Sequence, residues 1–441
     1  MPIASSGAVR GGLLDRVDDA RRRSDELFGI VRPDALYERP IPERHRIIFY
    51  VGHLEAFDWN LLHGVLPDLK AFDPELDRLF AFGIDPVNGS LPADQPSDWP
   101  RLGAIQDYVS KIRAALDEKL EDEGSFGRAP DGFSLETLLN VAIEHRLMHV
   151  ETLAYMLHQL PWHQKVPHKA PADRIFPPST PSMINVPSGV AKLGLPRASS
   201  VFGWDNEFEA HEVEVPAFEI DRYKVTNREY LEFLNSGGYD GRELWRLEDW
   251  HWKTNEHISH PAFWKKAGEN WLFRGMFEEI PLPLDWPVFV SHAEASAFAN
   301  WAGKCLPTEK EWQRAAYGTM EGKERQYPWG FNPPEGGLGN FDFERWNPAP
   351  VNAFPRGESA FGVQDMLGNG WEWTSSEFAP FPGFKAFSFY KGYSADFFDG
   401  KHFVLKGASP RTAVCMLRPS FRNWFQPHYQ YVYAGFRCVK R

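Results

Sequence analysis

Residues 134–160 read SLETLLNVAIEHRLMHVETLAYMLHQL, and apolar residues recur in this stretch at the three- and four-residue spacing of a helix. Ser134 is a favourable N-cap residue, so the helix is predicted to begin there. His145 and His149 stand at positions i and i+4, which places them on one face of the helix, one turn apart. Two imidazoles with this spacing can reach a single metal ion.

The same spacing predicts three further helices before residue 165, and Pro42 suits the first turn of one of them. Together the four segments indicate a helical bundle. They cover residues 13–28, 42–66, 102–120 and 134–160.

A third histidine, His53, lies midway along the helix predicted over residues 42–66, in the sequence GHLEAFDWN. Antiparallel neighbours in a bundle can bring it opposite the pair, and three imidazoles would then bind one face of a metal ion. Asp58 and Glu151 are candidates to orient the ligand rings through their second nitrogens. Imidazole accepts Zn, Fe, Cu or Ni, and a site with open positions suits O2 chemistry and hydrolysis equally. A structural or surface histidine pair is the plain alternative.

The chain changes character after this bundle. Residues 161–187 are rich in proline, which interrupts helices and central strands. Beyond them, short segments are broken by Gly, Pro and Asn, as in an irregular α+β domain. We therefore predict a bundle over residues 1–165, a linker over 166–187 and a second domain over 188–441.

Composition narrows the class of partner. The 441 residues carry a formal net charge of -12, which gives no electrostatic reason to bind nucleic acid or an acidic membrane surface. No signal-peptide core or long apolar run is seen, and three cysteines are too few for a disulfide framework. We expect a cytoplasmic protein with a small-molecule partner.

The second half contains an ordered series of motifs: FEIDRYKVTNREYLEFLN, WPVFVSHAEASAFANWAGKCLPTEKEWQRAAYG, YPWG, DMLGNGWEWTSS and GFRCV. This series resembles the formylglycine-generating-enzyme-like (C-type-lectin-like) domain. The cysteine pair of enzymes that make formylglycine is reduced here to Cys415, which argues against that reaction. His53 with His145-x3-His149 resembles the DinB-like metal-binding bundle. Both domains in this order resemble the ergothioneine synthases, the EgtB-type non-haem iron family.

The resemblance implies that Fe(II) is held by the three histidines and that O2 is a co-substrate. It also places Asn423 and Trp424, in the segment RPSFRNWFQP, beside hercynine, the trimethylated betaine of histidine. Aromatic faces suit a trimethylammonium group, which cannot donate an N–H hydrogen bond. Core residues of the last strands are the alternative for this pair. Family members draw a proton donor from a tyrosine of the second domain, and here Tyr390 and Tyr393 are the candidates.

Two departures from the family bear on the second substrate. Members that take γ-glutamylcysteine carry arginines after the second helix and an acid after the Asn-Trp pair. Residues 80–100 contain no arginine here, and Phe425 follows Trp424. Met148 also replaces the glutamine that often precedes the last ligand histidine. Because unpaired buried charges are costly, we expect a less charged donor, with a selenosugar as in the selenoneine synthase branch favoured over cysteine or γ-glutamylcysteine.

Two readings compete with an iron enzyme, namely a small-molecule binding module on a helical scaffold and a zinc-dependent thiol transferase. Other features are given modest roles. Glu309 and Glu311 are expected to form the solvated start of a helix with Thr308 as its N-cap. Asn369 and Glu372 are expected to be structural, with a Ca2+ loop as the alternative.

Overall fold

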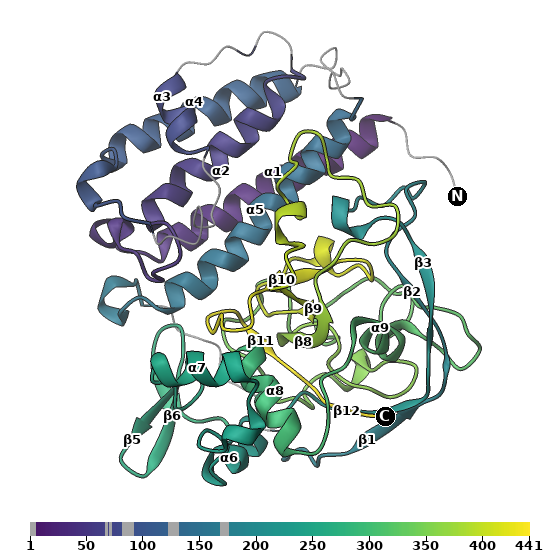
Figure 1. The fold of residues 1–441 in the computed structure, drawn as a ribbon. Helices are drawn as coiled ribbons and strands as arrows, with labels where there is room; N and C mark the ends of the chain where they lie inside the picture. The colour runs from purple at the N-terminus through teal and green to yellow at the C-terminus, as the bar shows by residue number, and fades with distance from the viewer. Residues whose placement is uncertain (1–5, 67–68, 70–72, 82–91, 122–131, 168–175) are drawn as a thin grey trace. The chain divides into compact units, whose positions relative to one another are not determined.

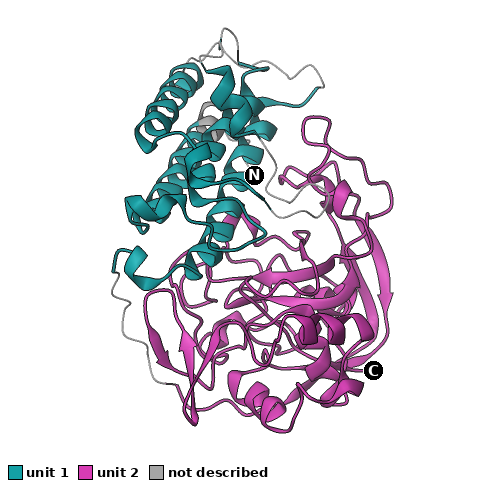
Figure 2. Cartoon of the chain, turned by 60° about the vertical axis from the view of Figure 1, so that its left-hand side comes forward, with its two compact units in different colours: residues 1–168 teal, residues 169–441 magenta. Residues whose placement is uncertain are grey.

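The computed structural model describes residues 6–66, 69, 73–81, 92–121, 132–167 and 176–441 (Figure 1). The chain divides into two compact units, unit 1 over Met1–His168 and unit 2 over Lys169–Arg441 (Figure 2). Unit 1 is helical, whereas unit 2 combines short helices with small sheets. The predicted α+β class, a helical bundle followed by an irregular mixed domain, is confirmed.

Unit 1 is built around two long helices that pack along each other. Helix α1 packs on α5, and α2 packs on both α4 and α5 (Figure 1). No helix within the described ranges is long and apolar enough to cross a membrane. The helices of unit 1 are α1 (Ser6–Gly29), α2 (Ile47–Leu62), α3 (Pro74–Leu79), α4 (Leu102–Glu121) and α5 (Leu135–His158).

Capping explains where these helices begin. The hydroxyl of Ser134 accepts a hydrogen bond from the backbone N–H of Thr137, at 3.2 Å, as predicted for an N-cap. The prediction that Pro42 occupies the first turn of the second helix is wrong. Arg46 has an extended backbone, with ψ at 153°, and α2 begins only after it.

Residues 176–441 of unit 2 form four small sheets, in the orders β1-β4-β12, β10-β9-β8-β11, β2-β3 and β5-β6-β7. Strand β1 falls inside the range expected to be a linker, where it forms a sheet edge paired with β4; residues 168–175 of that range lie outside the described residues. The helices are α6 (Asn227–Asn235), α7 (Leu247–Asn255), α8 (His292–Trp301) and α9 (Glu309–Tyr317). The strands are β1 (Met183–Val186), β2 (Gly189–Leu193), β3 (His211–Val215), β4 (Phe218–Asp221), β5 (Trp264–Ala267), β6 (Asn270–Arg274), β7 (Glu279–Pro281), β8 (Gly370–Glu377), β9 (Phe403–Ala408), β10 (Asn423–Phe425), β11 (Ala434–Gly435) and β12 (Val439–Lys440).

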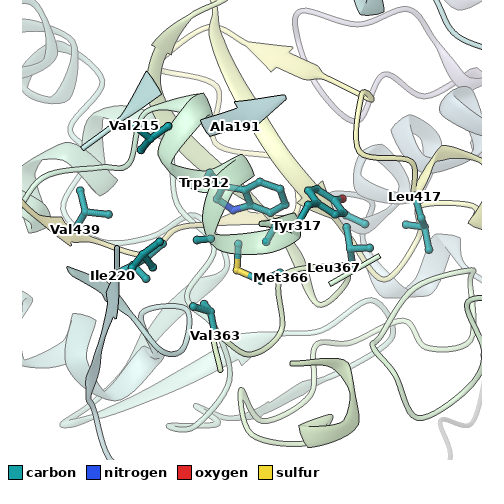
Figure 3. Close-up of a cluster of buried hydrophobic side chains, with 14 of the residues drawn as sticks. Ala191, Val215, Ile220, Trp312, Tyr317, Val363, Met366, Leu367, Leu417 and Val439 are labelled. Atoms are coloured by element: carbon teal, nitrogen blue, oxygen red, sulfur yellow. The ribbon is translucent and has the colours of Figure 1, made fainter. Parts of the chain in front are cut away.

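The core of unit 2 surrounds α9 and the segment that leads into β8. Trp312 and Met366 lie in the hydrophobic cluster drawn in Figure 3. The indole N–H of Trp312 donates to Glu372 at 2.9 Å, and Glu372 also pairs with Arg437 at 2.6 Å and with Lys224 at 2.9 Å. The chain's own cations thus neutralise this buried carboxylate, which supports the structural interpretation of Glu372 over the Ca2+ alternative.

Candidate functional site

The three histidines predicted as metal ligands come together in unit 1. His145 and His149 lie one turn apart on α5, with their Nε2 atoms 3.1 Å apart. His53 lies on α2, and one ring nitrogen from each of the three residues falls within 4.8 Å of the others. All three side chains are buried. The fold therefore gathers the residues that the sequence singled out.

A backbone carbonyl fixes the tautomer of His53. Its Nδ1 lies 2.6 Å from the carbonyl oxygen of Phe80, which can only accept, so Nδ1 carries the hydrogen and Nε2 the lone pair. Gly52 permits this close approach, because a Cβ at that position would lie 2.5 Å from the Phe80 ring. The result is an Nε2 lone pair available to a metal ion.

The electrostatics favour neutral rings. Burial lowers the pKa of His53 to about 4. Burial also lowers the pKa of His145 and of His149 well below the usual range for histidine. Neutral imidazole is the form that binds metals, so the site needs no proton release to accept one at pH 7. The donor set fits Fe, Zn, Cu or Ni and does not choose among them.

Aromatic rings hold the imidazoles in place. Phe57 stacks on His145 with ring centroids 3.4 Å apart, and Phe49 stacks on His53 at 4.7 Å. Both phenylalanines lie on α2, one turn before and one turn after His53. Each ring is thereby restricted to one orientation, which is what a preorganised ligand set requires.

A buried ionic network lies behind the histidines and ties four helices together. The guanidinium of Arg146 on α5 donates to Glu55 at 2.9 Å and to Asp58 at 2.6 Å, both on α2. It also donates to the hydroxyl of Ser24 on α1, at 3.2 Å. Arg113 on α4 reaches the same Glu55 oxygen at 2.7 Å. Because Arg146 directly follows His145, this network sets the position of α5 against α2.

The network corrects one expectation. Asp58 was predicted to orient a ligand histidine, but its Oδ2 accepts from Arg146, and the Phe80 carbonyl orients His53 instead. Burial raises the pKa of Asp58 despite Arg146, whereas burial of Glu55 is outweighed by its arginines, which lower its pKa to about 2. Sequence reasoning missed Arg146. The signal was two carboxylates at i and i+3, Glu55 and Asp58, in a mainly apolar helix. The role expected of Glu151, which is buried, stays a prediction.

In unit 2, the predicted substrate residues form β10, paired antiparallel with β9. Trp424 stacks on Phe378 with centroids 4.2 Å apart, and the rings of Tyr393 and Phe397 lie 5.5 Å and 5.6 Å from it. The side-chain oxygen of Asn423 accepts from the backbone N–H of Trp424 at 2.9 Å. Both residues are half-buried, so the aromatic cluster forms a wall that is not sealed inside the core.

The other two predicted substrate residues, Phe425 and Met148, have apolar side chains. Phe425 lies opposite Phe403 in the strand register and stacks on Tyr429 with centroids 5.2 Å apart. Met148 is half-buried on α5 of unit 1, directly before His149. Their contact with a substrate stays a prediction.

The buried ion pair of Arg422 and Glu309 packs against the aromatic cluster. Arg422 binds Glu309 through two hydrogen bonds of 2.9 Å and 3.1 Å, and its guanidinium lies 4.9 Å from the ring centre of Phe378, on which Trp424 stacks. The expectation that Glu309 and Glu311 are solvated is therefore wrong, since each is only 5% exposed. Thr308 is the N-cap as predicted; its hydroxyl accepts from the backbone N–H of Glu311 at 3.3 Å.

Of the two candidate proton donors, Tyr393 lies beside the aromatic cluster. It stacks on Trp204 with centroids 4.0 Å apart and meets Trp424 at 5.5 Å in an edge contact. Tyr390 is one ring further away, 5.5 Å from Tyr393.

The segment expected to bind the second substrate is only partly described, since residues 82–91 lie outside the described ranges. The fold brings two arginines from earlier in the chain to its end, a contact that the sequence did not reveal. Arg39 and Arg46 both pair with Asp94, and Arg39 also donates to the carbonyl of Pro92 at 2.7 Å. The one carboxylate of Asp94 offsets only one of these two guanidinium charges.

Comparison with known proteins agrees with the two-part architecture. The DinB superfamily matches residues 16–153, and the sulfatase-modifying factor enzyme 1-like domain matches residues 170–441. Hercynine oxygenase of Mycolicibacterium smegmatis is 38% identical over 445 residues, covering 98% of this chain and 99% of that protein. Ergothioneine biosynthesis protein 1 of Neurospora crassa is 28% identical over 500 residues, covering 92% of this chain and 55% of that protein. Among solved structures, PvdO from Pseudomonas aeruginosa aligns with 60% of this chain and 99% of its own, with 20% identity and a TM-score of 0.40.

Proposed function

This chain belongs to the hercynine oxygenase family, and we propose that it joins a chalcogen atom to carbon 2 of the hercynine imidazole in an O2-dependent reaction. The observation that carries the proposal is the set of three buried, neutral histidines on α2 and α5. His53, His145 and His149 would hold Fe(II). When bound there, iron would supply the site at which O2 is activated.

Hercynine is assigned to the aromatic cluster around Trp424. A trimethylammonium group is attracted to the faces of Trp and Tyr rings, and Phe378 holds the Trp424 ring in one orientation. The amide of Asn423 can orient a carboxylate or an imidazole nitrogen. Tyr393 is assigned as the proton donor, because it is the candidate tyrosine in contact with Trp424.

The chalcogen donor is proposed to carry little charge, and a selenosugar is the favoured form. Phe425, at the position where the resemblance places an acid, stacks on Tyr429 and offers no charge partner. Arg39 and Arg46 share the single carboxylate of Asp94, so only one of their two charges is left to balance a donor carboxylate. A donor with two carboxylates would leave charges unpaired, at a cost of about 1–3 kcal/mol or more for each buried group. The relative named for ergothioneine biosynthesis supports the sulfur alternative. Cysteine or γ-glutamylcysteine would be the donor in that case.

Incubation of the Fe(II)-loaded protein with hercynine, O2 and each donor in turn tests these assignments. We expect oxygen consumption that tracks product in mass spectra, with the selenosugar as the best donor. Product from γ-glutamylcysteine but not from the selenosugar would overturn the donor assignment. Product without oxygen consumption would favour the zinc-dependent transferase.

Metal content tests the histidine assignment separately. His145→Ala should lose bound iron, whereas His63→Ala, an exposed histidine at the end of α2, should retain it. Equal iron content in both variants would contradict the enzymatic hypothesis and favour a non-enzymatic binding module.

A further inference from the structure

A second polar cluster lies in unit 2 beside β10, built from Asp249 on α7, His292 on α8 and His428 in the loop after β10; we call it the acceptor cluster. The Nε2 of His428 lies 2.8 Å from Oδ1 of Asp249, and its ring stacks on Trp252 with centroids 4.6 Å apart and planes 3° apart. The carboxylate and the indole come from the same helix, so α7 fixes this imidazole on two sides.

The cluster is attached to the strand that carries the proposed substrate residues. His292 stacks on Phe403 with centroids 3.8 Å apart, and Phe403 lies opposite Phe425 in the strand register. The carbonyl of Pro427 accepts from the N–H of Ala293 at 3.1 Å, which seats the loop on the start of α8. Phe403 thus links the acceptor cluster to Phe425 on β10.

The buried atoms of the cluster are lone-pair acceptors. The Nε2 of His292 donates to the carbonyl of Thr374 at 3.2 Å, so its Nδ1 carries a lone pair. Neither this Nδ1 nor Oδ2 of Asp249 meets a donor among the described residues, although both residues are 3% exposed. Buried acceptors without donors are costly and are normally satisfied by some partner. His428 donates to this carboxylate through Nε2, and its side chain is 32% exposed, so it forms the open side of the cluster.

The charged groups near the acceptor cluster restrict the charge of a ligand that could bind there. Asp249 acts electrostatically on His292, whose pKa burial lowers to about 4, and Arg246 and His428 act on the same ring. Arg246 is exposed, so its charge is screened by solvent, whereas the Asp249 carboxylate is buried. A ligand that brings carboxylates would be repelled by Asp249, while hydroxyl groups can donate to Oδ2 of Asp249 and Nδ1 of His292 without adding charge.

We propose that the acceptor cluster binds a neutral, hydroxyl-rich ligand and that this ligand is the polyol part of the chalcogen donor. The assignment rests on the proposed function for the identity of the reaction, but not for binding itself. Asp249 and His292 accept hydrogen bonds from hydroxyl groups, and His428 closes the exposed side of the site.

Kinetics with two donors test the role of the cluster. With hercynine saturating, Asp249→Asn should raise the KM of the Fe(II)-loaded enzyme for 1-thio-β-D-glucose by about tenfold or more, because it removes a charge-assisted acceptor. The KM for hercynine should not change, and the KM for γ-glutamylcysteine should fall. His251→Gln, an exposed histidine on the same helix, is the matched control and should change neither KM. An unchanged thioglucose KM in Asp249→Asn, or an equal rise for hercynine, would overturn the proposal.

A binding measurement separates this proposal from the reaction. Ligand-observed NMR of the full chain with methyl β-D-glucopyranoside at millimolar concentration should show binding that Asp249→Asn and His428→Leu abolish. If the wild type turns over no donor yet binds the glycoside in this way, the proposed function fails and the acceptor cluster stands. If the wild type does not bind the glycoside, or binds it equally after both substitutions, the acceptor cluster fails.

Discussion

Replacement of Arg146 by methionine should destabilise unit 1 more than any surface change of the same kind. Glu55 and Asp58 are buried, at 0% and 4% exposure, and Arg146 binds both. Breaking a buried ion pair from one side costs about 3–5 kcal/mol, because a charge is left uncompensated. Glu55 keeps Arg113 at 2.7 Å, so Asp58 bears most of the loss. At about 2–4 °C for each kcal/mol in a unit of this size, Tm should fall by about 10 °C.

Urea denaturation at pH 7, followed by far-UV circular dichroism, measures this cost. Arg22→Met is the control: it removes a guanidinium from exposed pairs with Asp19 and Glu26 on α1, and such pairs contribute about 0–1 kcal/mol. A second comparison isolates the mechanism. Adding Glu55→Gln and Asp58→Asn to Arg146→Met removes the unpaired charges and should recover part of the stability. The reasoning is refuted if Arg146→Met costs no more than Arg22→Met, or if the triple variant is no more stable than the single one.

Three further predictions concern the candidate site. Gly52→Ala should displace Phe80, whose carbonyl orients His53, and should weaken iron binding by about tenfold in a chelator competition; unchanged affinity would contradict the role of that carbonyl. In the metal-free protein, the pKa of His53 is about 4 when folded and 6.5 when unfolded. Above pH 6.5 the ring is neutral in both states, whereas below it the unfolded state takes up a proton first and is favoured. The free energy of unfolding should therefore fall by about 3 kcal/mol as pH falls from 6.5 to 4. In His53→Asn it should fall less steeply over that range, as measured in denaturant titrations. Trp424→Leu should raise the KM for hercynine by about tenfold without changing iron content, whereas Trp301→Leu, 37% exposed, should change neither.

Features that depend on neighbouring residues in the sequence could be predicted. The spacing of His145 and His149 follows from helix geometry alone, and the Ser134 cap follows from the bonding needs of the first helical turn. The α+β class likewise follows from a change in periodicity and proline content along the chain. The first two features depend on residues within one or two helical turns, the class depends on composition along the chain, and the structure agrees with all three.

Features that depend on the choice of a distant partner could not be predicted. Asp58 was assigned to a histidine because only sequence proximity was visible, whereas packing of α5 on α2 brings it Arg146, 88 residues away. Glu309 was expected in solvent because a helix start is usually exposed, yet Arg422, 113 residues later, folds over it. A charged residue can be buried where the fold places an oppositely charged side chain beside it, and the tertiary fold decides which side chain that is.

The coupling between the three histidines and the ionic network follows from the adjacency of His145 and Arg146 on α5. Successive residues of a helix point about 100° apart, so His145 and Arg146 face different neighbours while sharing one backbone. Arg146 pairs with α2 residues two and five positions beyond His53, and the histidine rings converge over the same stretch of α2. A shift of α5 along α2 by one residue, 1.5 Å, would break the ion pairs and separate the ring nitrogens together. The ionic network therefore fixes the register of α5 on α2, and this register holds three histidines from two helices within reach of one ion.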